Sequence, residues 1–183
     1  MTAAELDFQE VSEQFLRSLD KGHLDAAASR LLSASIGDIV TVLSRSPAHK
    51  HYSLADIEWL ILPPVIGGQF YVVEATHRER GFRAPVAVVT WALVSEEVDQ
   101  RLQEGVGRRK RLRPDEWTGG EIGWLIDAVG GSTEIHSALH HLANGPFKDR
   151  ELKIAERHER GTSITTLKSI LFSKHGQASE GIG

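Results

Sequence analysis

The stretch "QFYVVEATHRERGFRAPVAVVTWALV", residues 69–94, carries the clearest structural signal in the chain. Its two ends, residues 69–75 and 84–94, are rich in the β-branched and aromatic residues that favour strands. The polar residues 76–82 between them include a glycine, as hairpin loops often do. We therefore predict two neighbouring strands joined by this loop.

Strand and helix patterns alternate after this hairpin. The apolar residues 122–131 and the alternating residues 150–158 are predicted to be strands. Ser95 and Ser132 each precede a helical pattern and are typical N-cap residues. The corresponding helices are expected at residues 95–105 and 132–143, and a last helix at residues 163–174.

Helical spacing dominates the sequence before the hairpin. Apolar residues predict three helices near residues 8–19, 24–32 and 36–43, the last stopped by Pro47. Ser53 with Asp56 resembles a capping box, so another helix is expected from Leu54 to the segment 63–68. This order of elements predicts an α/β (α+β) fold with a mixed sheet and helices on its faces. We expect a helical N-terminal extension (residues 1–38), a main domain (39–175) and a flexible tail (176–183).

The composition is that of an ordinary globular chain. Its 183 residues are 40% hydrophobic and 25% charged, which suits one domain with a core. The net charge of −4 argues against general nucleic-acid binding. The absence of cysteine excludes disulfides, thiolate catalysis and cysteine-based zinc sites. Neither a signal peptide nor an apolar run of about 20 residues is present, so we expect a soluble intracellular protein.

Two histidines and one aspartate are candidates for chemistry. The polar stretch "SPAHKHY", residues 46–52, contains His49 and His51, which are by default residues of a surface loop. Asp127 lies in the apolar stretch "WLIDAV", where an ionised carboxylate is costly unless it is paired or exposed. A salt bridge or an exposed strand end would explain Asp127 without any function.

A metal site is not expected. His136 and His140 stand one helical turn apart, a spacing that metal sites use. The segment "HSALH" lacks the glutamate of the HExxH motif, and no third ligand is evident. We interpret these residues, with His141, as a solvated helix face.

A basic segment, "GRRKRLR" at residues 107–113, holds five cations in seven positions. Its functional interpretation is an electrostatic dock for an acidic partner, and its default interpretation is a solvated loop. The five cations are Arg108, Arg109, Lys110, Arg111 and Arg113.

The preceding "GVG", residues 105–107, is a weak match to the phosphate loop of acyl-coenzyme A users, because Leu102 stands where those proteins have Arg or Gln.

Three blocks of the sequence resemble one family, the toxin-activating lysine acyltransferases that modify RTX protoxins in bacteria. The blocks are "SPAHKHYSLADIEWLILPPVIGGQFYVV" (46–73), "PVAVVTWALVSEE" (85–97) and "DEWTGGEIGWLIDAVGG" (115–131). The resemblance extends over residues 40–172 with order and spacing kept, and the third block is the most specific.

The resemblance implies a fold similar to the GNAT acyltransferases, with a largely antiparallel sheet. It also implies transfer of a fatty acyl chain from acyl carrier protein to internal lysines of a protoxin, in the cytoplasm, by a homodimer without a bound cofactor. The family's catalytic histidine falls on His49, its aspartate on Asp127 and a nearby serine on Ser46. Because acyl carrier protein is acidic, the basic segment 107–113 becomes its expected binding site.

The chemistry of amide formation fits these residues. A lysine amine has a reference pKa of about 10.4, so reaching the neutral form at pH 7 costs roughly 4.6 kcal/mol. We expect His49 to act as the general base on the lysine. Asp127 either orients His49 or binds the ammonium group, and Ser46 either donates to the thioester oxyanion or caps backbone. Direct transfer is preferred over an acyl-enzyme.

Two other functions remain open at this point. One is a GNAT-type N-acyltransferase that uses acyl-coenzyme A on another protein or a small amine. The other is a non-catalytic interaction protein. For acyl transfer, residues 59–66 and the strand around Trp91 are expected to line an apolar groove, although core packing is their default role.

Overall fold

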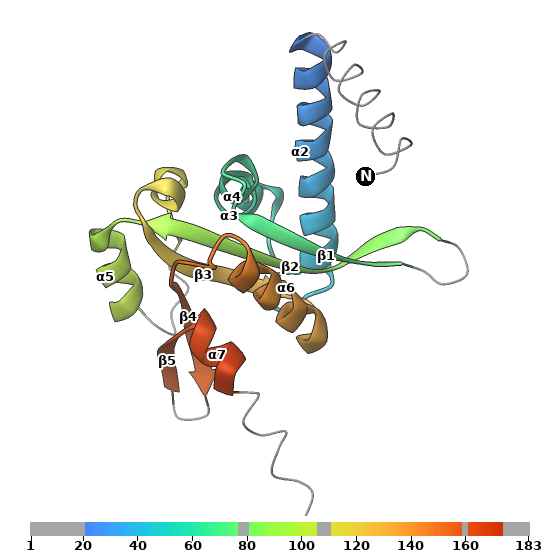
Figure 1. Ribbon diagram of the computed structural model, residues 1–183. Helices are drawn as coiled ribbons and strands as arrows, with labels where there is room; N and C mark the ends of the chain where they lie inside the picture. Colours follow the sequence, from blue (N-terminus) through green and yellow to red (C-terminus); the bar gives the residue numbers. More distant parts are fainter. Residues whose placement is uncertain (1–20, 77–80, 106–110, 159–160, 174–183) are drawn as a thin grey trace, which may run out of the picture. The chain divides into compact units, whose positions relative to one another are not determined.

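The computed structural model describes residues 21–76, 81–105, 111–158 and 161–173 (Figure 1). By its internal contacts the chain divides after Ser35 into two units, and the sheet and all helical residues after Ser35 belong to the second. The helix predicted near residues 8–19 and the tail lie outside the described residues. The predicted boundaries of extension, main domain and tail therefore stay predictions.

A five-stranded mixed sheet forms the centre of the second unit. Its strands lie side by side in chain order. Neighbouring strands are antiparallel except for β3 and β4, which are parallel and pair where Gly123 meets Leu152 and Trp124 meets Lys153. The prediction of a mixed, largely antiparallel sheet is confirmed. The strands are β1 (Phe70–Thr76), β2 (Arg83–Val94), β3 (Ile122–Val129), β4 (Leu152–His158) and β5 (Gly161–Thr166).

The helices agree with the predictions at most positions. Ser95 caps α5 through the backbone N–H of Val98, as expected, whereas the N-cap of α6 is Gly131 and not Ser132. In chain order the helices are α2 (Lys21–Ser44), the 3-10 turn η1 (Leu54–Asp56), α3 (Ile57–Leu60), α4 (Leu62–Ile66), α5 (Glu96–Glu104), the 3-10 turn η2 (Pro114–Thr118), α6 (Ser132–Asn144) and α7 (Leu167–Ser173).

Three predictions about element boundaries were wrong. Residues 24–32 and 36–43 belong to one helix, because a single interior glycine, Gly37, weakens a helix without ending it. The two prolines at 63–64 begin α4 instead of ending a helix, since the first helical turn needs no N–H donor. Residues 163–166 form β5, because their β-branched side chains favour pairing with β4.

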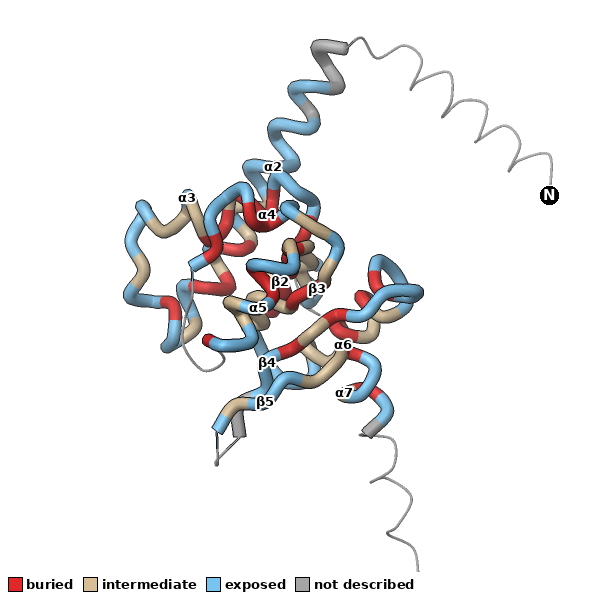
Figure 2. The backbone as a smooth tube through the Cα atoms, turned by 90° about the vertical axis from the view of Figure 1, so that its left-hand side faces the viewer, coloured by how far each residue is buried: buried red, intermediate tan, exposed pale blue. Residues whose placement is uncertain are grey.

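Helices cover both faces of the sheet. On one face α6 and α7 pack against alternate residues of β2, among them Val89 and Trp91. On the other face the last turns of α2, with α3 and α4, pack against Val88 and Val129. Figure 2 shows the buried residues concentrated along the central strands and the helix sides that face them.

A β-bulge in β3 changes which face its side chains occupy. Trp91 pairs with Leu125, but the adjacent Thr90 pairs with Asp127, so Ile126 is an extra residue. Leu125 packs beneath α6, whereas Val129 packs against α2 and α3. Regular alternation would put Asp127 on the same face as Leu125. The bulge instead turns Asp127 toward the face covered by α2 and α3.

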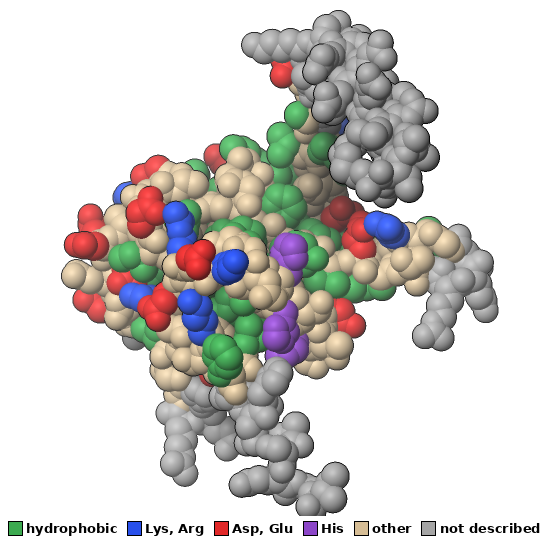
Figure 3. Space-filling model, in the orientation of Figure 1, with side chains coloured by type: hydrophobic (Ala, Val, Ile, Leu, Met, Phe, Trp, Pro, Cys, Tyr) green, Lys and Arg blue, Asp and Glu red, His purple; other side chains and the backbone are tan. Residues whose placement is uncertain are grey.

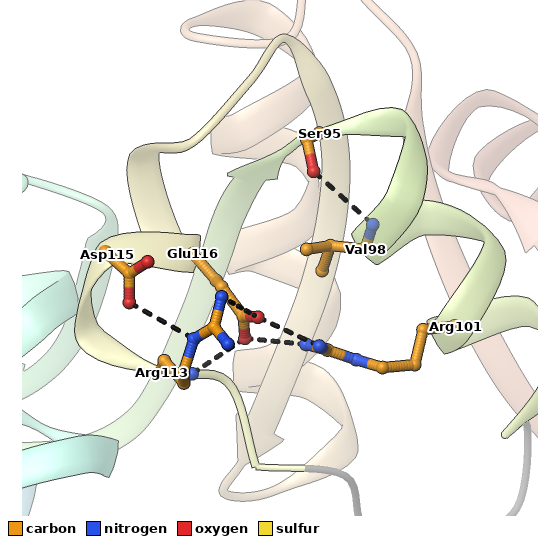
Figure 4. Close-up of polar contacts among 6 residues, drawn as sticks. All are labelled: Ser95, Val98, Arg101, Arg113, Asp115 and Glu116. Carbon is orange, nitrogen blue, oxygen red and sulfur yellow. Dashed lines mark hydrogen bonds and ion pairs between the residues drawn. The ribbon is translucent and has the colours of Figure 1, made fainter.

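Two buried carboxylates hold α5 against the rest of the unit. Glu116 in η2 accepts both terminal nitrogens of Arg101, at 2.9 and 2.6 Å, and Arg113 converges on it from the other side (Figure 4). The hydrogen bonds from Arg101 lower the pKa of Glu116. Burial works to raise the pKa of Asp99, but hydrogen bonds from Lys153 and neighbouring side chains lower it overall.

Candidate active site

A tight turn after α2 brings Ser46 and His49 together. The backbone N–H of His49 donates to the carbonyl oxygen of Ser46 at 3.0 Å, which closes a four-residue turn. Pro47 occupies its second position, where proline is favoured. As a result the Ser46 hydroxyl lies 2.9 Å from Nδ1 of His49. Their closeness in sequence is therefore the means by which this pair forms.

Asp127 reaches the opposite nitrogen of the same imidazole. Its Oδ2 lies 2.6 Å from Nε2 of His49, and its Oδ1 accepts the backbone N–H of Ala128 at 3.0 Å. His49 is buried, with 6% of its surface exposed, while the Asp127 side chain is 27% exposed. The structure thus joins Ser46, His49 and Asp127 in one hydrogen-bonded chain. His51, two residues away, is exposed.

The arrangement fixes which nitrogen of His49 can accept a proton. A carboxylate accepts hydrogen bonds and cannot donate them, so Nε2 carries a hydrogen and donates it in a hydrogen bond to Asp127. The lone pair of the neutral ring is then on Nδ1, where the Ser46 hydroxyl donates to it. The ring of Tyr52 packs edge-on against the imidazole, with the ring centroids 5.4 Å apart, and supports its orientation. Such a chain suits general acid–base catalysis.

Thr90 is a neighbour of this site that the sequence analysis missed. It lies directly opposite Asp127 in the sheet and is 5% exposed. Its hydroxyl has no hydrogen-bond partner among the described residues. Paired residues of antiparallel strands present their side chains to the same face. Only the register of β2 against β3 identifies this residue, and no local sequence pattern records that register.

The described residues offer no metal site. They contain no group of three or more His, Asp or Glu side chains that could hold an ion. Nε2 of His136 and Nε2 of His140 lie 3.1 Å apart, and the ring of His141 stacks on Tyr71 with centroids 3.9 Å apart. Figure 3 shows histidine side chains next to hydrophobic ones on the face of the molecule that it displays.

The basic segment is described only at its end. Arg108, Arg109 and Lys110, like the "VG" of "GVG", lie outside the described residues. Arg111 donates to Asp56 at 3.1 Å, and its guanidinium lies 4.4 Å from the ring centroid of Trp59. Arg113 pairs with Glu116 and Asp115. Both arginines are about two thirds exposed, and their predicted role in binding acyl carrier protein stays a prediction.

An apolar cavity of about 370 Å³ opens beside His49, between the end of α2 and the segment from residue 50 to α3. Leu60 and Ile61, from the segment expected to form a groove, contribute to its lining. Trp91, the other expected contributor, lies in the core, and its ring centroid is 5.8 Å from that of Phe147.

None of the described helices has the length and apolar character needed to cross a bilayer.

Comparison with known proteins assigns the family. The model of the RTX toxin acyltransferase family (HlyC) matches residues 31–170, a range that contains Ser46, His49 and Asp127. The chain is 34% identical over 122 residues to the lysine-acyltransferase RtxC of Vibrio cholerae serotype O1. That match covers 64% of this chain and 73% of the relative. The chain therefore belongs to the RTX toxin acyltransferase family, and the predicted resemblance is confirmed.

Proposed function

We propose that this toxin acyltransferase moves a fatty acyl chain from acyl carrier protein to a lysine amine of an RTX-type protoxin, with His49 as general base. The observation that carries the proposal is the chain of hydrogen bonds from Ser46 through His49 to Asp127. The relative RtxC, which is named a lysine-acyltransferase, supports lysine as the acceptor.

In the proposed reaction the lysine first loses one ammonium proton to solvent. The neutral nitrogen attacks the thioester carbonyl carbon, and its second proton passes through the Ser46 hydroxyl to Nδ1 of His49. The Asp127 carboxylate stabilises the imidazolium that results. The carbon–sulfur bond then breaks, and the imidazolium protonates the leaving thiolate. The balance is one amide, one thiol and one released proton.

The donor, the compartment and the oligomeric state belong to the same proposal. Acyl carrier protein as donor, action in the cytoplasm and a homodimer follow from the family resemblance. Light scattering of the purified protein measures the oligomeric state directly. Parallel reactions with acyl carrier protein and coenzyme A thioesters of the same chain length decide between the proposed donor and the GNAT-type alternative.

The decisive experiment measures acylation of a lysine-containing fragment of an RTX-type protoxin by intact mass. His49→Ala is expected to lower the rate by about 10² to 10⁴, the usual contribution of a general base. Asp127→Asn keeps the shape of the side chain but removes its charge, and it is expected to cost at least about 10². His51→Ala, at the exposed neighbour, serves as the matched control.

Circular dichroism confirms that each variant is folded before its rate is compared. Full activity of a folded His49→Ala protein would contradict the proposed mechanism. Absence of transfer by the unmodified protein with either donor would contradict the proposed function itself, and would favour a non-catalytic role.

A further inference from the structure

We propose that the cavity beside His49 binds the apolar chain of the acyl donor, an inference that rests on acyl transfer at His49. The cavity is lined by His49 and by residues of α2, η1 and α3 that all belong to the second structural unit. Its volume of about 370 Å³ falls in the range of small-molecule sites. Its apolar lining residues are Val40, Leu43, Leu54, Ile57, Leu60 and Ile61.

The polar side chains of the lining favour an apolar ligand, because most of them are already engaged. The Ser44 hydroxyl donates to the carbonyl of Thr41. Both nitrogens of His49 are hydrogen-bonded. The Asp56 carboxylate accepts from Ser53, Trp59 and Arg111. A polar ligand would therefore have to displace these bonds, whereas a hydrocarbon chain would not.

Exposed hydrophobic side chains mark the entrance. Leu54 is 85% exposed and Val40 is 38% exposed, and both line the cavity. Single exposed leucines are common on protein surfaces, but apolar residues at the mouth of an apolar cavity extend the surface that a chain can cover. A donor chain bound there shields both residues from water.

The two substrates would then approach the imidazole from different directions. His49 belongs to the lining of the cavity, whereas Asp127 does not. The chain would lie against α2 and α3, and its thioester would end near His49. The lysine ammonium would first meet the partly exposed carboxylate of Asp127. After its first proton is lost, the neutral amine would reach the Ser46 hydroxyl, which, like Asp127, does not line the cavity.

The experiment compares donors with chains of 4 to 16 carbons, attached to acyl carrier protein in one arm and to coenzyme A in the other. Each methylene that enters the cavity should improve the apparent affinity about fourfold. Val40→Trp fills the mouth of the cavity and should flatten this dependence. Ile66→Trp is the matched control, because Ile66 is 75% exposed on a nearby helix and does not line the cavity.

Equal chain-length dependence in Val40→Trp and in the unmodified protein would overturn the proposal. Leu54→Asp gives a second variant should the tryptophan impair folding, since a charge at this exposed position should also weaken long-chain donors. A dependence on chain length in only one arm identifies the carrier that delivers the chain. Loss of that dependence in the variants still supports binding of the chain in the cavity.

A binding measurement separates this inference from the proposed function. Calorimetric titration with dodecanoate needs no transfer reaction. Binding by the unmodified protein and by Ile66→Trp, but not by Val40→Trp, supports the cavity even if no acylation is detected. Equal binding by all three proteins, or no binding by any of them, overturns it.

Discussion

Thr90 faces Asp127 across two antiparallel strands and carries a buried hydroxyl without a partner among the described residues. A buried hydroxyl that makes no hydrogen bond costs about 1 to 3 kcal/mol. In the proposed reaction this group lies where the incoming ammonium would meet Asp127. The hydroxyl of Thr90 is therefore expected to lower the stability of the fold but to favour binding of the lysine.

We predict that Thr90→Val leaves the free energy of unfolding unchanged or raises it by about 1 kcal/mol, because valine removes the unpaired hydroxyl. The KM for the lysine-bearing substrate should rise, while Thr90→Ser should restore it. Urea unfolding and initial rates measure the two effects. Unchanged KM in a stable Thr90→Val protein would show that the hydroxyl does not contact the substrate.

The residues of the candidate site could be named from sequence only in part. The structure brings Ser46 and His49 together through the turn at Pro47, whereas the sequence places both in the site only through the family resemblance. The sequence marks Asp127 as an unusual carboxylate in an apolar strand, but its partner is 78 residues away. No local pattern encodes such a contact, and the family resemblance supplied the pairing.

Among the elements, α5 depends on ion pairs that its own sequence does not reveal. The Arg101 guanidinium lowers the pKa of Glu116, whose side chain is only 4% exposed. A carboxyl with a lowered pKa in the folded state stabilises the fold at pH values above its unfolded pKa. That contribution is lost as the pH falls through the lowered, folded-state pKa.

We predict that Glu116→Gln lowers the free energy of unfolding by about 2 kcal/mol at pH 7, because Arg101 loses its ionic partner. The difference from the unmodified protein should shrink as the pH falls below about 4.5, the reference pKa of the carboxyl. Urea unfolding between pH 3 and 7 measures this convergence.

Asp115→Asn is the control for this prediction. Asp115 pairs with Arg113 at 3.5 Å, but both side chains are at least 70% exposed, so the change should alter stability by less than about 0.5 kcal/mol. Parallel pH curves for Glu116→Gln and the unmodified protein would argue against a stabilising role of the Glu116 carboxylate.

Element types were easier to predict than their boundaries and faces. The hairpin and β3 follow from composition, since runs of β-branched residues have few alternatives. The bulge at Ile126 could not be predicted, because it depends on pairing with β2 and leaves the residue pattern unchanged. An interpretation by regular alternation places Asp127 on the wrong side of the sheet.

At the scale of the whole molecule, charge is distributed unevenly along the chain. The segment 107–113 is strongly basic although the net charge is −4. On the face seen in Figure 3, by contrast, acidic and basic side chains are interspersed. A local positive segment attracts an acidic partner over a distance that shrinks as salt is added.

We predict that replacing Arg108, Arg109 and Lys110 by Gln lowers kcat/KM for acyl carrier protein thioesters and flattens its dependence on salt. The same change at the exposed residues Lys148, Arg150 and Lys168 is the control for net charge. Initial rates from 20 mM to about 500 mM salt test the prediction. Equal salt dependence in the two triple variants would contradict the proposed binding of acyl carrier protein by the segment 107–113.

The general fold was accessible from sequence because the order of elements leaves few ways to build one sheet. The predicted boundary at residue 38 stays a prediction; it falls within the helix from Lys21 to Ser44.

Asp56 binds the N-terminal cap of η1, the indole of Trp59 and the guanidinium of Arg111 with a single carboxylate, and it also borders the cavity. An acidic partner that recruits Arg111 must compete with Asp56 for it. Binding of the carrier protein at Arg111 and binding of its acyl chain in the cavity would consequently be thermodynamically linked. Each would alter the affinity of the other by the same factor. The binding free energies measured separately for a free fatty acid and for unloaded carrier protein would then not sum to the binding free energy of the acylated carrier protein.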